Sequence, residues 1–144
     1  MHLEYFIGSK YRLILLCDEN IGTGVPKALA LVGYDTRWFV ALGWAGKKDE
    51  EWLPWVGQNG WLLFSCNKKM LLVPSEHAAI VQNRVGVVFL TNGEEYPARV
   101  LRLLLAKWDT LELLWSLTEK PFARFLSPNG HLARKYRYYE LGVL

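Results

Sequence analysis

Acidic and polar side chains stand at three separate points of this sequence, and their types suit the binding of a hard divalent cation. Asp18 and Glu19 directly follow one apolar run, and Ser65 and Asn67 follow another. A third group comes after a glycine-containing loop and consists of Asp49, Glu50 and Glu51. Mg²⁺ and Mn²⁺ favour oxygen ligands, and such sites activate water against phosphodiesters. The same residue types also serve as turn residues, helix caps and partners of helix dipoles, so residue type alone leaves both interpretations open.

The apolar runs before these residues predict the strands that would position them. Predicted strands occupy residues 13–17, 36–40, 61–65 and 86–90. Helices are expected at residues 26–32, 49–58, 75–82 and 96–117. Pro54 would remove a hydrogen bond from the second helix, which is expected to kink there or to begin later than Asp49. Ser75 is the expected cap of the third helix.

Strands that alternate with helices predict an α/β fold, with a short parallel sheet of about four strands and helices on its faces. Residues 122–126 and 132–138 are expected to form a C-terminal β-hairpin. We expect one domain over residues 1–144, with a core at about 11–118 and the hairpin within about 119–138. Ligands of open α/β sheets bind outside the carboxyl ends of the strands. The three polar groups are therefore expected to converge on one rim.

Composition excludes several classes of protein. Hydrophobic residues make up 51% of the 144 residues, which excludes a disordered chain. No apolar run reaches the roughly 18 residues that span a bilayer, so we expect a soluble cytoplasmic protein without a membrane partner. Two cysteines, Cys17 and Cys66, are too few for a disulfide framework. The net charge of +3 does not by itself indicate a nucleic-acid partner.

Local basic pairs and aromatic residues lie close to the predicted rim. The candidates for contact with RNA phosphates are Lys47, Lys48, Lys68 and Lys69, although such pairs are more often solvated surface. Trp44 and Trp52 are the tryptophans that could be exposed beside the acidic residues, where an indole could stack on an unpaired base. Core packing is the ordinary role of both side chains.

An ordered set of segments resembles the PIN-like domains of the VapC toxin branch. These segments are Asp18-Glu-Asn20, Gly24-Val-Pro-Lys-Ala-Leu29, Gly33-Tyr-Asp35, Lys48-Asp-Glu-Glu-Trp-Leu-Pro54, Phe64-Ser-Cys-Asn67, Glu119-Lys-Pro-Phe-Ala123 and Ser127-Pro-Asn-Gly130. They extend from about residue 11 to residue 135 in the family's order. The resemblance implies a three-layer PIN-like fold and a ribonuclease dependent on Mg²⁺ or Mn²⁺, often the toxin half of a toxin–antitoxin pair. It also implies an antitoxin partner, and homodimers are common in the family.

The resemblance implies roles for particular residues. Asp18 would be the first metal-binding carboxylate, and either Asp49 or Glu50 would supply the acid of the second helix, with Glu51 remaining open. The third acid of the family usually stands in a Thr-x-Asp pattern, where this chain has Ser65-Cys-Asn67. Asn67 can offer a carbonyl oxygen but carries no charge, so metal binding should weaken. Glu19 is the alternative source of a further carboxylate.

That departure leaves a second hypothesis of another class. The chain could be a catalytically inactive module that keeps the fold and binds a protein or RNA partner. An ammonium group of Lys68 or Lys69 inside the acidic site would favour the module. Convergence of oxygens on one point would favour the enzyme, the expected set being Asp18, Asp49, Glu50 and Asn67.

Overall fold

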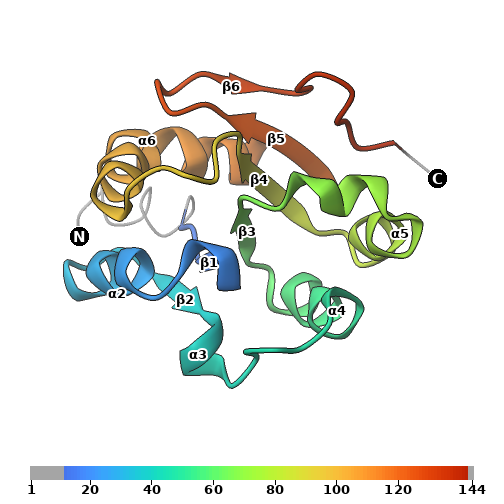
Figure 1. Cartoon of the computed structure of the whole chain (residues 1–144), viewed down its shortest axis with the longest axis horizontal. Helices are drawn as coiled ribbons and strands as arrows, with labels where there is room; N and C mark the ends of the chain where they lie inside the picture. The colour runs from blue at the N-terminus through green and yellow to red at the C-terminus, as the bar shows by residue number, and fades with distance from the viewer. Residues whose placement is uncertain (1–11, 143–144) are drawn as a thin grey trace, which may run out of the picture.

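A six-stranded sheet runs through the middle of the molecule, which the computed structural model describes over residues 12–142 (Figure 1). Its strands are β1 (Leu15–Cys17), β2 (Thr36–Trp38), β3 (Leu62–Ser65), β4 (Gly86–Leu90), β5 (Phe122–Leu126) and β6 (Leu132–Ala133). They lie in the order β2-β1-β3-β4-β5-β6. The first five are parallel, and only β6 pairs antiparallel. The carboxyl ends of β1, β3, β4 and β5 therefore share one edge of the sheet.

The expected α/β class is confirmed, but the expected size of the sheet is wrong. The expected hairpin is present, because β5 and β6 pair antiparallel, but its second strand ends at Ala133 and not at residue 138. Strand β5 also pairs in parallel with β4 along its whole length, with Phe89 beside Phe125. Four of the five β5 side chains are buried, so the strand contributes to the core on both faces and becomes part of the sheet. The following turn then adds β6 at the edge.

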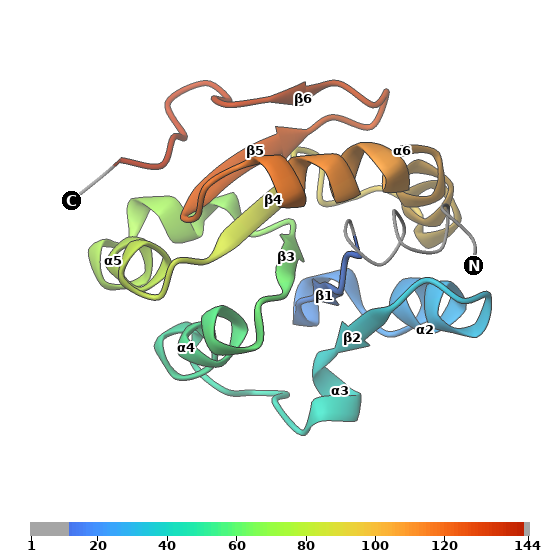
Figure 2. The ribbon, with the colours of Figure 1, turned by 180° about the vertical axis from the view of Figure 1, so that it is seen from behind.

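Helices cover both faces of the sheet, as the two opposite views show (Figures 1 and 2). One face is covered by α2 (Gly24–Leu31) and α6 (Pro97–Leu117). The other is covered by α3 (Phe39–Leu42), α4 (Asp49–Asn59) and α5 (Pro74–Gln82). Two short 3-10 helices, η1 (Glu19–Ile21) and η2 (Lys68–Leu72), follow β1 and β3. Among residues 12–142, no helix has the length and apolar character needed to cross a bilayer.

Alternation along the buried strands divides the core into two halves. In β1, Leu16 packs toward α4 and α5, whereas Leu15 packs toward α2 and α6. Leu63 and Leu62 of β3 repeat this division. Because successive strand residues point to opposite faces, a fully apolar strand is the form that a sheet with two covered faces requires.

Several local boundaries differ from the sequence expectation, and the differences at β2, α4 and α5 concern elements around the acidic residues. Residues 36–40 were expected to be one strand, but β2 ends at Trp38 and Phe39 begins α3. The Phe39 ring packs edge-on against Trp52, with ring centroids 4.9 Å apart. This packing buries Phe39 against α4, where the chain leaves β2 and begins α3. Helix α4 begins at Asp49 and continues through Pro54. Helix α5 begins at Pro74, so Ser75 lies in its first turn instead of capping it.

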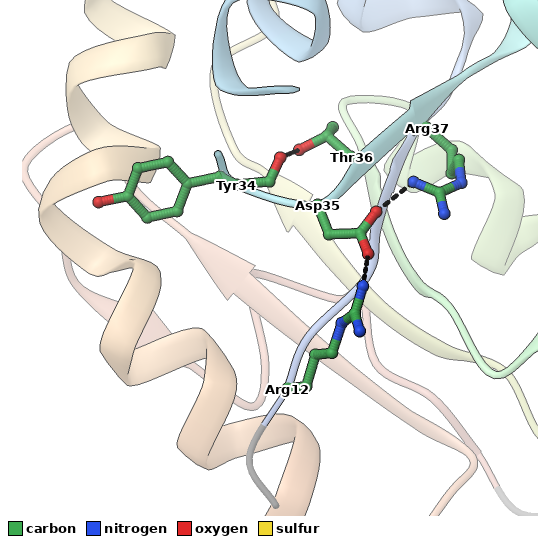
Figure 3. Close-up of polar contacts among 5 residues, drawn as sticks. All are labelled: Arg12, Tyr34, Asp35, Thr36 and Arg37. Atoms are coloured by element: carbon green, nitrogen blue, oxygen red, sulfur yellow. Dashed lines mark hydrogen bonds and ion pairs between the residues drawn. The ribbon is translucent and has the colours of Figure 1, made fainter. Parts of the chain in front are cut away.

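An ionic bridge ties the segments that enter β1 and β2 (Figure 3). The Asp35 carboxylate accepts hydrogen bonds from Arg12, at 2.6 Å, and from Arg37. Partial burial acts to raise the pKa of Asp35, but the two guanidinium groups outweigh it and lower that pKa. Beside it, the Thr36 hydroxyl donates to the Tyr34 carbonyl at 2.9 Å. Of these bonds, the Arg12–Asp35 pair joins the residues that precede β1 and β2, and the other two are local to residues 34–37.

Candidate active site

A cavity of about 320 Å³ opens at the carboxyl ends of β1 and β3. Three polar side chains reach it from separate elements: Asp18 directly after β1, Asp49 from the first position of α4, and Asn67 from the turn after β3. Glu19 also lines it, and its Oε1 accepts a hydrogen bond from the Gly46 backbone at 3.0 Å. The structure therefore brings together groups that are up to 49 residues apart in the sequence.

Asp18 is the most deeply held acid of this cavity, with only 4% of its surface exposed. Its Oδ2 accepts a hydrogen bond from the Ser65 hydroxyl, and its Oδ1 accepts one from the Asn20 backbone at 3.1 Å. The Ser65 oxygen in turn accepts a bond from the Asn67 backbone at 2.9 Å. Ser65 thus connects the end of β1 to the turn that carries Asn67, and it fixes the orientation of the Asp18 carboxylate.

The electrostatics of Asp18 favour a positive charge in the cavity. The pKa of Asp18 is raised from 3.8 to about 6, mainly by burial and to a smaller extent by the nearby Asp49 carboxylate, against the hydrogen bonds from Ser65 and Asn20. Burial disfavours a carboxylate because the protein solvates the charge less well than water does. A cation bound beside Asp18 would stabilise the buried carboxylate charge. Without a cation, protonation removes that charge at low pH.

The three acids at the start of α4 point in different directions. Asp49 lines the cavity. The Glu50 Oε1 instead accepts a hydrogen bond from Ser75 at 2.8 Å, and this bond lowers the pKa of Glu50. Glu51 turns back to the start of its own helix, where its Oε1 accepts from the Lys48 backbone at 3.4 Å. Of the three candidates left open by the sequence, Asp49 is the one located in the cavity.

Glu76, in the first turn of α5, is an acidic neighbour of the site that the sequence reasoning missed. Burial raises the pKa of Glu76 from 4.5 to about 8, together with its hydrogen bond to Asp49 and the charges of Asp49 and Glu50. The only sequence signal was an acid in the first turn of a predicted helix, and this pattern ordinarily reflects the helix dipole.

The candidate RNA-binding lysines are divided between the cavity and other surfaces. Lys47 lines the cavity, and its ammonium lies 5.6 Å from the centre of the Trp55 ring. Lys68 points away from the acids, because its ammonium donates to the Thr91 carbonyl at 3.1 Å. Lys48 and Lys69 are exposed. Lys68 therefore does not fill the acidic site.

The tryptophans near the site are more buried than the sequence suggested. Trp52 lines the cavity, but only 2% of its surface is exposed, so the expectation that it could be exposed is wrong. Trp44 is half-buried and packs against Phe39, with ring centroids 5.7 Å apart. Core packing is the role that explains Trp52.

The donor types in the cavity fit a hard cation, but the set is incomplete. Asp18 and Asp49 offer carboxylate oxygens, and Asn67 offers an amide oxygen, which are ligands that Mg²⁺ and Mn²⁺ accept. Within residues 12–142, however, no group of three or more His, Cys, Asp or Glu side chains is gathered so as to hold a metal ion. The residue that departs from the expected third acid is Asn67, and its neutral side chain accounts for part of this deficit.

Comparison with known proteins gives one informative match. A family model described as a PIN-like domain matches residues 14–92, which is more than half of the chain. The match extends from β1 through β4 and includes Asp18, Asp49 and Asn67. No curated protein and no solved structure matches the chain. PIN-like domains are generally nucleases. The chain belongs to the PIN-like domain family.

Proposed function

We propose that this protein is an endoribonuclease that depends on Mg²⁺ or Mn²⁺ and is weakened by Asn67. One observation carries the proposal. The buried Asp18 carboxylate, with its pKa raised to about 6, lines one cavity with Asp49 and Asn67 at the carboxyl ends of two neighbouring strands. Membership of a family that is generally nucleolytic supports the same conclusion.

Each side chain has a distinct task in this proposal. Asp18 and Asp49 would hold the cation, with the Asn67 amide as a neutral third ligand. When bound, the cation would supply positive charge against the phosphate and the attacking water. Ser65 orients Asp18 through its hydrogen bond. Lys47 stands at the wall of the same cavity and can contact a phosphate of the RNA.

The biological setting is a further part of the proposal. The likeness to the VapC branch supports a role as the toxin of a toxin–antitoxin pair in the cytoplasm. An antitoxin protein and a homodimer are the partners that this setting implies. Each is tested by the mass of the complex that the purified chain forms, alone and with a co-expressed partner.

One observation favours a second candidate, an inactive PIN-like module that binds RNA or protein without cleavage. Among the described residues, no third carboxylate joins Asp18 and Asp49 in a metal-binding group. The module would also be favoured by a lysine ammonium inside the acidic site. Lys68 does not provide one, because its ammonium donates a hydrogen bond to the Thr91 carbonyl outside the cavity.

Calorimetric titration with Mn²⁺ tests the enzyme against the module. The wild-type chain should bind Mn²⁺ saturably, Asp18→Ala should abolish the binding, and Glu119→Ala, at an exposed acid far along the sequence, should retain it. A cleavage assay on single-stranded RNA with the same three proteins should follow the same order. If the wild type binds no Mn²⁺ at millimolar concentration, the metal-dependent mechanism is refuted and the module becomes the better description.

A further inference from the structure

A second hollow, of about 530 Å³, lies between the first half of α6 and the turn that joins β5 to β6. Its apolar surface comes from Leu90 at the end of β4 and from Val100, Leu103 and Ala106 of α6. Residues 128–130 of the turn close the opposite side. Except for Leu90, all of these residues lie beyond the segment that matches the family, so the hollow belongs to the part of the chain that the family match does not describe.

The hollow carries an excess of positive charge. Arg99, Arg102 and Lys107 line it, against the single carboxylate of Glu95. Glu95 is already engaged, since its oxygens contact Arg99 at 3.5 Å and accept from Asn92 at 3.1 Å. Over residues 12–142, neither Arg102 nor Lys107 forms an ion pair. Both are therefore available to an anionic ligand.

The end of the Lys107 side chain lies close to the turn at Gly130, which carries no side chain. A Cβ at Gly130 would lie 2.7 Å from the Lys107 Cε, and the residue has a φ of +92° that other residues rarely adopt. The glycine thus allows the lysine stem to lie flat on the turn. Lys107 is half-buried as a residue and lines the hollow.

The hollow lies on the same sheet edge as the acidic cavity. Leu90 ends β4 and Asp18 follows β1, with β3 as the only strand between them. Neighbouring strands are about 4.8 Å apart, so the carboxyl ends of β1 and β4 are about 10 Å apart along this edge. From there the hollow extends over α6 on one face of the sheet, whereas the acidic cavity extends over α3 and α4 on the other. An extended ligand that crosses the carboxyl edge of the sheet would reach both.

We propose that this hollow binds the phosphates of a single-stranded RNA that crosses the sheet edge and places another of its phosphodiesters in the acidic cavity, an inference that rests on the proposed ribonuclease function. The acids of the cavity repel a polyanion, so an RNA chain needs cations beside the cavity to remain bound. Lys47 provides one on one side, and Arg102 and Lys107 provide two in the hollow. The apolar floor accepts ribose and base surface.

The test measures RNA binding without cleavage. A labelled ten-nucleotide oligouridylate is titrated in a chelating buffer with the wild type, with Arg102→Ala/Lys107→Ala, and with Arg134→Ala/Lys135→Ala. The last is the matched control because it removes two exposed cations after β6. Loss of two phosphate contacts should weaken binding about twentyfold near 0.1 M salt and reduce the log–log salt slope by about 1.4. The control should change neither quantity to this extent.

A second readout separates this inference from the proposed function. With Mn²⁺ present and RNA below saturation, the hollow variant should cleave the ten-nucleotide RNA about twentyfold more slowly than the wild type. Its cleavage of a dinucleotide, which reaches only the acidic cavity, should be unchanged. Equal affinity and salt slope in the two double variants would overturn the inference and leave the nuclease standing. Loss of RNA binding in the hollow variant without any cleavage by the wild type would keep the RNA site and refute the nuclease. The inference is also overturned if an acidic, leucine-containing peptide loses binding in the hollow variant while RNA does not.

Discussion

Replacing Asp18 by Asn should make the metal-free protein more stable at neutral pH. Burial raises the pKa of this carboxyl group from 3.8 to about 6. A folded-state pKa above the unfolded value means that the neutral form stabilises the fold. This stabilisation is fully present below about pH 3.8 and is lost as the pH rises through about 6. Asn is close in shape to the protonated side chain and never ionises, so the variant escapes the loss.

The size of the effect follows from the shift. A difference of about 2 pKa units corresponds to about 3 kcal/mol, of which about 2 kcal/mol is lost between about pH 4.5 and about pH 7.5. The amide nitrogen of Asn cannot accept the hydrogen bond that one oxygen of Asp18 accepts. The lost bond lowers the free energy of unfolding of the variant by about 1 kcal/mol at every pH. The variant should therefore equal the wild type at about pH 4.5 and exceed it by about 2 kcal/mol at about pH 7.5.

Urea unfolding at both pH values, in chelating buffer, measures this difference. Glu119→Gln controls for the loss of one negative charge at an exposed position. Addition of Mn²⁺ should then stabilise the wild type but not Asp18→Asn, since only a ligand of the folded state raises stability. A difference between variant and wild type that does not change with pH would refute the argument that burial disfavours the Asp18 charge.

Two further substitutions test the packing and hydrogen bonds that position the site. Gly57→Ala would place a Cβ 2.1 Å from the Asn83 carbonyl oxygen and should lower the free energy of unfolding, by about 1–3 kcal/mol. Gly24→Ala, with nothing within 4 Å of the new Cβ, should change it by less than about 0.5 kcal/mol; equal urea midpoints for the two would contradict the close approach. Ser65→Ala removes the bond that lowers the pKa of Asp18, so the pH-dependent loss of stability should move to higher pH, at a further cost of about 1–3 kcal/mol. An unchanged pH profile would show that this bond is weak.

Local pattern accounts for the parts of the fold that the sequence predicted well. The continuous apolar runs mark buried strands because a sheet covered on both faces leaves no exposed strand side. The prediction of strand 86–90 agrees with β4, and that of helix 96–117 agrees with α6 to within one residue. In α6, the buried positions include Val100, Leu104, Trp108 and Leu111, as a helical period requires. The position of Asp18 after a strand also followed from sequence alone.

Pairing between distant segments accounts for what the sequence did not predict. Residues 122–126 have the apolar pattern of a strand whether they form an isolated hairpin or join the sheet. Their pairing with β4 depends on α6, which carries the chain back to the same sheet in parallel. The contact of Asp49 with Glu76 depends likewise on the N-termini of α4 and α5 lying together.

The sequence by itself determined the α/β class, the buried strands, and the places along the chain where carboxylates meet the strand ends. These properties depend on residue type and on periods of a few residues. Only the tertiary structure decided that Asp49 lines the cavity while Glu50 contacts Ser75. It also decided that Lys68 bonds outside the acidic site. Side-chain direction at a site is set by contacts between segments far apart in the chain, and no local pattern encodes those contacts.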